Sequence, residues 1–334
     1  MSAPATVEAP ANIAFIKYWG ARDLDQALPV NASISMTLSE CVSVSTVSFA
    51  DGSDEPDRIE LVGDDGSLTL PDLRFRERAL THLDRVRRWA RRGGSFRVAT
   101  RNSFPTGAGI ASSASGFAAL TLASTKALGL ALSSPELSTL ARMSGSGSAA
   151  RSVLGGYVLW PADGSADGHA VTIAPASHWD LRDVIALVDQ GEKDVPSLEG
   201  HRLAPTSPHF DTRQRVLPAR LAAVRRAIDE RDLAVLGPVL EEEAIELHLI
   251  AMSSRPPIFY WKPGTVQVLE TLRRLRRDGV PAFATMDAGA NVHVICEPAA
   301  EGPVVTALER LASVSGVLLD GVGVGPRARR EHLF

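Results

Sequence analysis

Residues 104–116 read FPTGAGIASSASG and lead directly into the apolar run 117–128, and this stretch decides the fold of the chain. Small residues let a backbone wrap closely around a ligand, and a helix that follows offers unpaired N–H groups and a partial positive charge. A phosphate group is the expected occupant. A flexible Gly/Ala/Ser linker is the alternative, but a linker would not continue into a strong helix. The stretch is neither a GxxxxGK[ST] P-loop nor a Rossmann GxGxxG, so it predicts a phosphate site of another kind.

The composition is that of an ordinary globular protein. The chain has 334 residues, of which 45% are hydrophobic and 22% charged, enough for one large or two ordinary domains. A net charge of −4 argues against nucleic-acid and anionic-membrane partners. The sequence contains no apolar run of membrane-spanning length and no signal-peptide pattern at its start. Cys41 and Cys296 lack metal-ligand spacing, so we expect buried thiols in a reducing, cytoplasmic compartment.

The first half alternates predicted strands and helices around the phosphate stretch. A second loop of small residues, 144–152, follows a predicted helix at 134–143, so two anion-binding ends are expected to face one cleft. An arginine run on the helix 74–92 is read as a solvated face. The expected strands are 7–20, 30–38, 42–49, 95–100, 157–160 and 170–173, with a short hairpin at 59–61 and 68–70.

The second half reads as helices mixed with an antiparallel sheet, which is an α+β layer. We place the domain boundary near residues 177–181, and we expect a long, functional loop at 192–210. Strands are expected at 184–188, 282–286, 292–296 and 316–322, and helices at 212–230, 232–253, 265–277 and 301–313.

Four segments spread over the chain resemble the GHMP kinases and, more narrowly, their mevalonate-diphosphate decarboxylase branch. They are APANIAFIKYWG at 9–20, NSFPTGAGIASSASG at 102–116, SGSGSAARSVLGGYVLW at 144–160 and MDAGANVHVI at 286–295, with support from PPIFYW at 256–261. The resemblance implies an α+β GHMP-kinase fold. An N-terminal ribosomal-protein-S5-like, ATP-binding domain would span 1–180, a C-terminal ferredoxin-like domain would span 181–334, and the active site would lie in the cleft between them.

The resemblance also implies a reaction. ATP, with Mg²⁺, would phosphorylate the tertiary 3-hydroxyl of a mevalonate phosphate. The new phosphate and the carboxylate, as CO₂, would then leave to give an isopentenyl phosphate. Such a site must place the γ-phosphate in line with the hydroxyl and neutralise charge as it develops. Relatives of this kind are often homodimers, which we expect weakly here.

Residue roles follow from the same resemblance. Asp287 matches the catalytic aspartate, Arg151 the arginine that holds the substrate carboxylate, and Asn12 the asparagine that positions both. Lys17 and Tyr18 would contact substrate or phosphate. The substrate's terminal phosphate would be bound by Ser146, Gly147 and Ser148, and Ser197 would also bind the substrate. The nucleotide would be held by Asn102, Pro105, Gly107, Ala108, Gly109, Ala111, Ser112 and Ser113, with Ser112 as a magnesium ligand.

Each of these residues has a simpler interpretation when it is taken alone. An aspartate before Ala-Gly is usually a turn former, and a single arginine is usually a surface cation. Polar residues in a strand, such as Asn12 and Lys17, usually face solvent. His248 and His293 belong to no metal-ligand pattern, so we interpret both as structural.

Two departures from the family pattern concern the substrate. Diphosphate decarboxylases usually read KYWGK, whereas this chain has Ala21 after KYWG, and it has Leu198 where several bacterial relatives carry a cation. Each missing charge-assisted hydrogen bond would cost roughly 1.5–3 kcal/mol. The sequence therefore favours mevalonate 5-phosphate, with mevalonate 5-diphosphate as the alternative. A mevalonate 3-kinase and a non-catalytic GHMP-fold binding protein fit less well, because Asn12, Arg151 and Asp287 are all present.

Overall fold

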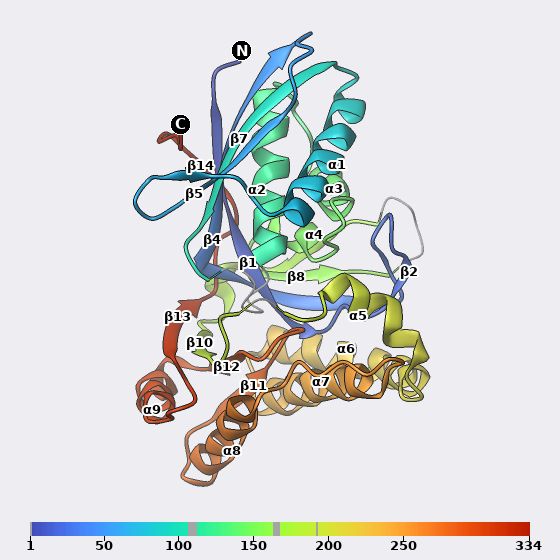
Figure 1. The fold of residues 1–334 in the computed structure, drawn as a ribbon. Helices are drawn as coiled ribbons and strands as arrows, with labels where there is room; N and C mark the ends of the chain where they lie inside the picture. The colour runs from blue at the N-terminus through green and yellow to red at the C-terminus, as the bar shows by residue number, and fades with distance from the viewer. Residues whose placement is uncertain (1, 106–111, 163–167, 192) are drawn as a thin grey trace.

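The computed structural model describes residues 2–105, 112–162, 168–191 and 193–334. An eight-stranded sheet forms the upper half in Figure 1, with strand order β14-β1-β4-β7-β5-β6 and with β8 and β9 continuing from β4. Among the strands that the structure describes in this sheet, the β5–β7 pair is parallel and the other pairs are antiparallel. The strands are β1 (Ala5–Ile16), β4 (Ser33–Asp51), β5 (Arg58–Val62), β6 (Leu68–Thr69), β7 (Gly94–Asn102), β8 (Tyr157–Trp160), β9 (Val171–Ala174) and β14 (Arg327–Arg329), beside a separate pair β2 (Ala21–Asp23) and β3 (Leu28–Pro29).

Helices cover one side of this sheet (Figure 1). They are α1 (Leu73–Ala90), α2 (Ser112–Ala127), α3 (Ser134–Arg142) and the short α4 (Ala149–Ser152). Most of α2 is buried, because small and apolar residues occur all around it rather than on one face. Phe117 of α2 and Leu83 of α1 pack in one core with Phe49 and Phe96 of the sheet. This packing fixes the first turn of α2 at the lower edge of the sheet.

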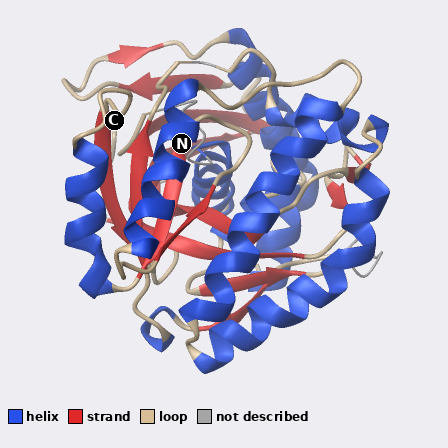
Figure 2. Cartoon of the chain, turned by 90° about the horizontal axis from the view of Figure 1, so that it is seen from below, coloured by secondary structure: helices blue, strands red, loops and turns tan. Residues whose placement is uncertain are grey.

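A four-stranded antiparallel sheet with strand order β11-β12-β10-β13 forms the other half. Seen from below, helices cross over and border these strands (Figure 2). Helices α8 and α9 share one core with this sheet, whereas α6 and α7 share a second core with both sheets. The elements are β10 (Arg182–Leu187), α5 (Ser197–Leu203), α6 (Phe210–Glu230), α7 (Leu233–Ser253), α8 (Pro263–Arg277), β11 (Ala282–Thr285), β12 (Val292–Cys296), α9 (Pro298–Glu309) and β13 (Gly316–Gly321), with 3₁₀ turns η1 (Ala176–His178) and η2 (Ala204–Thr206).

The structure corrects three expectations about elements. The predicted strands 30–38 and 42–49 are one strand, β4, because the carboxylate of Asp320 accepts the N–H groups of residues 39–41 at the expected break. The predicted loop 192–210 contains α5 and η2. Helix α2 begins at Ser112, within the phosphate stretch rather than after it.

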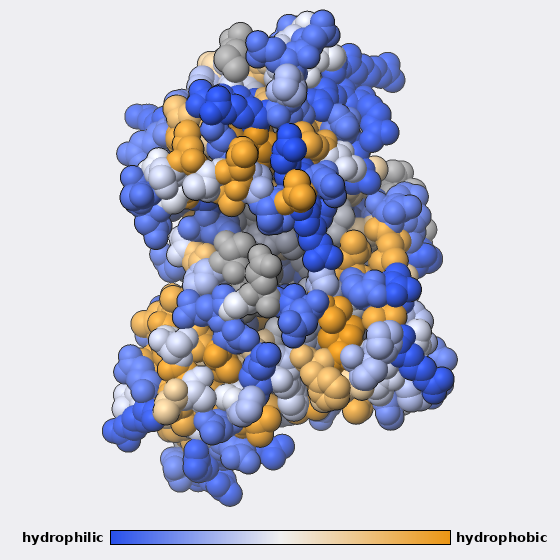
Figure 3. Space-filling model, in the orientation of Figure 1, coloured by the Kyte–Doolittle hydropathy of each residue, from blue (hydrophilic) through white to orange (hydrophobic). Residues whose placement is uncertain are grey.

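The chain returns to the first sheet near its end. Strand β14 pairs with β1, and Gly323 bonds to the backbone of Thr37 in β4. The division at residue 180 stays a prediction. On the face drawn in Figure 3, hydrophilic side chains predominate and hydrophobic ones gather in separate patches. None of the helices in the described part of the chain is both long and apolar enough to cross a membrane.

Candidate active site

A cavity of about 420 Å³ lies where the two halves meet, and residues from both halves line it. A smaller cavity of about 60 Å³ shares Tyr18, Ser148, Ser197, His201 and Asp287 with it. Asp287 therefore stands where the two spaces join. The larger cavity is also lined by Ala27, Asp72, Arg74, Arg78, Ser112, Ser113, Ala114, Gly145, Ser146, Gly147, Lys193, Pro196 and Leu198.

Asp287 lies in the turn between β11 and β12 and forms an ion pair with Lys17 from the end of β1. The Lys17 Nζ atom is 2.9 Å from Oδ1 of Asp287 and 2.6 Å from the carbonyl oxygen of Ala14. Burial alone would raise the pKa of Asp287, but the charge and hydrogen bond of Lys17, with His293 and Arg151 nearby, lower it below its usual value. Burial lowers the pKa of Lys17. The carboxylate is thus ionised and 26% exposed at the cavity.

Arg151 and Asn12 form a buried network next to this pair. The Arg151 Nε donates to Oδ1 of Asn12 at 3.1 Å, and its two terminal nitrogens donate to the hydroxyls of Ser33 and Ser148. Asn12 in turn donates to Ser152 at 2.8 Å. Burial lowers the pKa of Arg151 to about 10, so it still carries its charge at neutral pH. A fixed guanidinium at the smaller cavity suits the binding of a carboxylate.

Hydroxyl groups from the first turn of α2 and from the loop before α4 also line the larger cavity. Ser112 and Ser113 begin α2, and Ser113 Oγ lies 3.2 Å from Oγ of Ser146. A Cβ atom on Gly147 would lie 2.6 Å from the Tyr18 ring, so only glycine permits this close approach. The described residues of both predicted anion-binding stretches therefore line one cavity, and their binding of anions stays a prediction.

His201 and Lys193 are among the cavity residues that the sequence pattern did not predict. The His201 ring lies 4.1 Å from the ring of Tyr18, its Nδ1 accepts the N–H of Gly20, and burial lowers its pKa to about 3, so it is neutral. Lys193 donates to the Ser197 hydroxyl at 3.4 Å, and burial lowers its pKa while the charge of Asp287 opposes that shift. Lys193 is one of only four lysines in an arginine-rich chain, and this bias could have marked it.

The remaining predicted site residues lie elsewhere or outside the described residues. Asn102 accepts a hydrogen bond from Ser43, and neither Asn102 nor Pro105 is among the described residues that line these cavities. Gly107, Ala108, Gly109 and Ala111 lie outside the described residues. Their nucleotide-binding roles stay predictions.

His248 and His293 are both buried and take part in packing. The His248 ring lies 5.3 Å from the ring of Trp261, and His293 pairs with Asp183 at 2.6 Å. Within the residues that the structure describes, no three His, Cys, Asp or Glu side chains gather as a metal site. Cys41 and Cys296 are buried, unbonded thiols, as expected.

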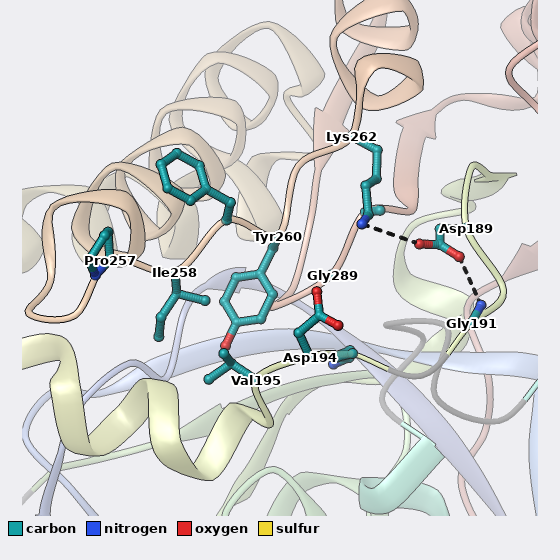
Figure 4. Close-up of a pocket in the computed structure, with 12 residues that line it drawn as sticks. Asp189, Gly191, Asp194, Val195, Pro257, Ile258, Tyr260, Lys262 and Gly289 are labelled. Carbon is teal, nitrogen blue, oxygen red and sulfur yellow. Dashed lines mark hydrogen bonds and ion pairs between the residues drawn. The ribbon is translucent and has the colours of Figure 1, made fainter.

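A third cavity, of about 270 Å³, is lined by Asp189, Gly191 and residues 193–195 together with residues of the segment 257–262 (Figure 4). Lys193 lines both this cavity and the larger one. Figure 4 shows Lys262 paired with Asp189, at 3.9 Å, and the ring of Tyr260 between Ile258 and Val195. Of the charged groups in this cavity, Lys262 and Asp189 are thus paired with each other.

Comparison with known proteins identifies the family. A model described as the diphosphomevalonate decarboxylase-like N-terminal domain matches residues 9–172, and one described as the mevalonate 5-diphosphate decarboxylase C-terminal domain matches residues 183–321. The chain belongs to the diphosphomevalonate decarboxylase family. It is 34% identical to the diphosphomevalonate decarboxylase of Candida albicans, over 98% of this chain and 99% of that protein, and 36% identical to the human enzyme, over 86% and 76%.

Solved structures agree with this membership. The crystal structure of mevalonate diphosphate decarboxylase from Staphylococcus aureus matches with a TM-score of 0.91 at 31% identity, over 99% of both chains. A structure named MDDEF in complex with MVAPP, AMPPCP and magnesium matches with a TM-score of 0.89 at 34% identity, over 98% of this chain and 99% of that one. The GHMP-kinase fold and the decarboxylase class predicted from the sequence are confirmed. The narrower likeness to phosphomevalonate decarboxylases is not supported by these relatives.

Proposed function

We propose that this family member is an ATP-dependent diphosphomevalonate decarboxylase, which converts mevalonate 5-diphosphate to isopentenyl diphosphate with release of ADP, phosphate and CO₂. The observation that carries the proposal is the meeting of Asp287, Lys17 and Arg151 at one cavity junction, beside the hydroxyl wall of Ser112, Ser113 and Ser146. The relatives named above support the diphosphate rather than the monophosphate.

Each of these side chains has a separate role in the proposed reaction. Asp287 accepts a hydrogen bond, and in transfer the proton, from the 3-hydroxyl as its oxygen bonds to the γ-phosphorus and the bond to ADP breaks. Lys17 and Lys193 stabilise negative charge near the transferring group. Loss of the new phosphate leaves positive character at C3, and the electrons of the carboxylate C–C bond form the alkene as CO₂ departs. Arg151, oriented by Asn12, holds that carboxylate.

The site also fits a triphosphate with Mg²⁺. Mg²⁺ usually keeps several waters and takes only one or two protein oxygens beside phosphate oxygens. The Ser112 hydroxyl at the first turn of α2 offers one such oxygen, and the described residues form no dedicated cage of acidic ligands. When bound, magnesium would offset phosphate charge during transfer.

The monophosphate is the second candidate, and one observation favours it. Ala21 packs against the apolar cluster of Tyr18 and Trp160, so the position after KYWG brings no charge to the site. Parallel assays with mevalonate 5-phosphate and mevalonate 5-diphosphate, each with Mg-ATP, test the proposal. A larger kcat/KM for the diphosphate supports it, and a larger kcat/KM for the monophosphate overturns it. Release of ADP without CO₂ would instead indicate a 3-kinase, and release of neither a binding protein.

Assembly and location are proposed from the family alone. We propose a cytoplasmic homodimer with small-molecule substrates and neither nucleic-acid nor membrane partners. Light scattering during gel filtration tests the dimer: a mass near 71 kDa supports it, since the chain is 35.5 kDa, and a mass near 35.5 kDa contradicts it.

A further inference from the structure

His201 lies where the two active-site cavities join, and the proposed reaction gives it no role. It lines both the larger and the smaller cavity, as Asp287 does. In that reaction Asp287 accepts the hydrogen of the 3-hydroxyl, and Arg151, at the smaller cavity, holds the carboxylate. The His201 side chain is half-buried beside them. What its ring does there depends on how it is held and on which nitrogen carries the proton.

The ring of His201 is held by close packing of α5 on the end of the first strand. A Cβ atom on Gly200 would lie 2.3 Å from the Trp19 ring, so only glycine lets α5 come this close. The next residue, His201, has its ring centroid 4.1 Å from that of Tyr18 and 4.9 Å from that of Trp19. Its Nδ1 atom accepts the backbone N–H of Gly20 at 3.1 Å. Two aromatic contacts and one hydrogen bond therefore fix the orientation of the ring.

The proton of this ring lies on Nε2. Burial, together with the charges of Arg213 and Arg151, lowers the pKa of His201 to about 3, so the ring is neutral. A neutral imidazole carries one proton, and Nδ1 cannot carry it because that atom accepts the N–H of Gly20. Nε2 is therefore an N–H donor, and among the described residues none accepts a hydrogen bond from it. A donor without a protein acceptor, at the junction of two cavities, is suited to a ligand oxygen.

The substrate carboxylate is the group that can take this donor. Arg151 uses three of its five N–H groups on Asn12, Ser33 and Ser148, which leaves two for a carboxylate in the described structure. A carboxylate has about four lone-pair sites, so it can accept a further N–H. The 3-hydroxyl oxygen is less suited, because an N–H donated to it would weaken it as the nucleophile that Asp287 activates.

We propose that the Nε2–H group of His201 donates a hydrogen bond to the substrate carboxylate, beside Arg151. This inference rests on the proposed function and adds a residue that orients the group lost as CO₂. A neutral donor suits this step, because the electrons of the carboxylate C–C bond move toward C3 as CO₂ departs. A second full charge at the carboxylate would stabilise it more before the reaction than in the transition state, and would slow the loss of CO₂.

The test separates the two ring nitrogens with three variants. His201→Asn keeps an acceptor near the Nδ1 position and removes the Nε2 donor, whereas His201→Gln places an amide N–H near Nε2 and leaves the N–H of Gly20 without its acceptor. His209→Asn is the control, because His209 is exposed and lines neither cavity. For each variant, kcat and KM are measured with mevalonate 5-diphosphate and mevalonate 5-phosphate, and Tm reports stability. The inhibition constant is measured for a diphosphate analogue that has a methyl group in place of the C1 carboxylate.

We expect His201→Asn to lose about 10-fold in kcat/KM with either substrate, mainly through KM, and to bind the methyl analogue within about 2-fold of the wild type. His201→Gln should keep more activity than His201→Asn although its Tm is lower, and His209→Asn should match the wild type. The inference is overturned if His201→Asn keeps full activity, if it binds the methyl analogue as poorly as the substrate, or if His201→Gln loses as much activity. A wild type that prefers the monophosphate contradicts the proposed function alone, because both substrates carry the carboxylate and the His201 effects should persist. A wild type that turns over neither substrate overturns both.

Discussion

The carboxyl group of Asp287 is held ionised by its neighbours, because the lysine at 2.9 Å outweighs the effect of burial on its pKa. Asp287→Asn keeps the shape and removes the charge and the proton acceptor. We expect it to fold, to bind ATP and to lose about 10²–10⁴ in kcat. Coupled ADP and CO₂ assays measure the loss. Asp189→Asn is the control, since Asp189 lines only the neighbouring cavity; near-normal turnover of Asp287→Asn would remove that residue from the mechanism.

Lys17 sets the pH range in which Asp287 works. The lowered pKa of Asp287 means that the carboxylate stays ionised until the pH falls below the usual range for aspartate, so activity should persist to that point. Lys17→Met removes the charge and the hydrogen bond that lower the pKa of Asp287. The burial of Asp287 remains, and it raises that pKa. The acid limb of the kcat/KM profile should therefore move to higher pH, together with a lower kcat. An unchanged acid limb would show that Lys17 does not control this titration.

Gly147 permits the contact between its loop and Tyr18. In Gly147→Ala the new methyl group would lie 2.6 Å from the Tyr18 ring and 3.0 Å from the Trp160 ring, so one wall of the cavity must shift. Overpacking of this kind typically costs about 1–3 kcal/mol. We expect KM for the mevalonate substrate to rise about 10-fold. Gly302→Ala is the control, because nothing lies within 4 Å of its Cβ position; if both variants behave alike, the close contact at Gly147 does not matter.

At the residue scale, the sequence could predict the groups that have a fixed spacing within one motif. Ser148 and Arg151 belong to one short stretch of the chain, and the hydrogen bond between them follows from their spacing. His201 and Lys193 could not be placed in the same way. His201 reaches the cavity because α5 folds inside a segment that reads as a loop, and because Trp19 packs against the His201 ring at 4.9 Å. Lys193 lies in the irregular segment before α5, where no pattern indicates the direction of a side chain.

At the scale of elements, the end of β1 is clamped by two helices. The backbone N–H of Lys17 donates to Glu243 of α7 at 3.1 Å, and its carbonyl oxygen accepts from Arg213 of α6 at 2.8 Å. Glu243 and Arg213 also pair with each other at 2.9 Å, both fully buried. The charge and hydrogen bonds of Arg213 lower the pKa of Glu243 although burial opposes them. The clamp therefore fixes the position of the Lys17 backbone, from which the side chain extends toward Asp287.

Breaking this clamp should affect stability and catalysis together. Glu243→Ala leaves the guanidinium of Arg213 buried without its partner, so we expect unfolding free energy to fall by about 3–5 kcal/mol. Because Lys17 loses a backbone contact, kcat should fall as well. Asp229→Ala is the control: it breaks the exposed pair of Asp229 with Arg225 and should cost less than about 1 kcal/mol. Denaturant unfolding with parallel assays measures both, and equal stability of the two variants would contradict the clamp.

Periodicity predicted most elements but not how they continue or join. It placed the amphipathic helix α8 and the continuous apolar strand β10 close to their observed bounds. It divided β4 at residues 39–41, because the polar pair Ser39–Glu40 ends the alternation. Asp320, about 280 residues away, keeps these residues in the strand, and no local pattern contains that information.

At the scale of the whole molecule, the segment after β13, which includes β14, connects the two halves. After β13 the chain leaves the second sheet, and β14 pairs with β1 of the first. Arg327 and Arg329 both bind the carboxylate of Glu8, whose side chain is only 6% exposed. Strand β1 thus joins the sheet at one end and delivers Lys17 to the active site at the other. This return was not predicted, because three residues give no readable alternation.

Replacing Arg327 and Arg329 tests whether their ion pairs with Glu8 stabilise this connection. Arg327→Gln/Arg329→Gln leaves Glu8 buried without a cation, and we expect a loss of about 1–3 kcal/mol, since the exposure of Arg327 weakens the pair. Adding Glu8→Gln should restore most of the loss, because a neutral amide needs no counter-charge. Exposed Arg330→Gln is the control. Thermal unfolding measures the stability of each variant, and a triple variant no more stable than the double one would contradict the role of Glu8. The kcat of the folded enzyme should stay constant, because none of these residues lines the cavity.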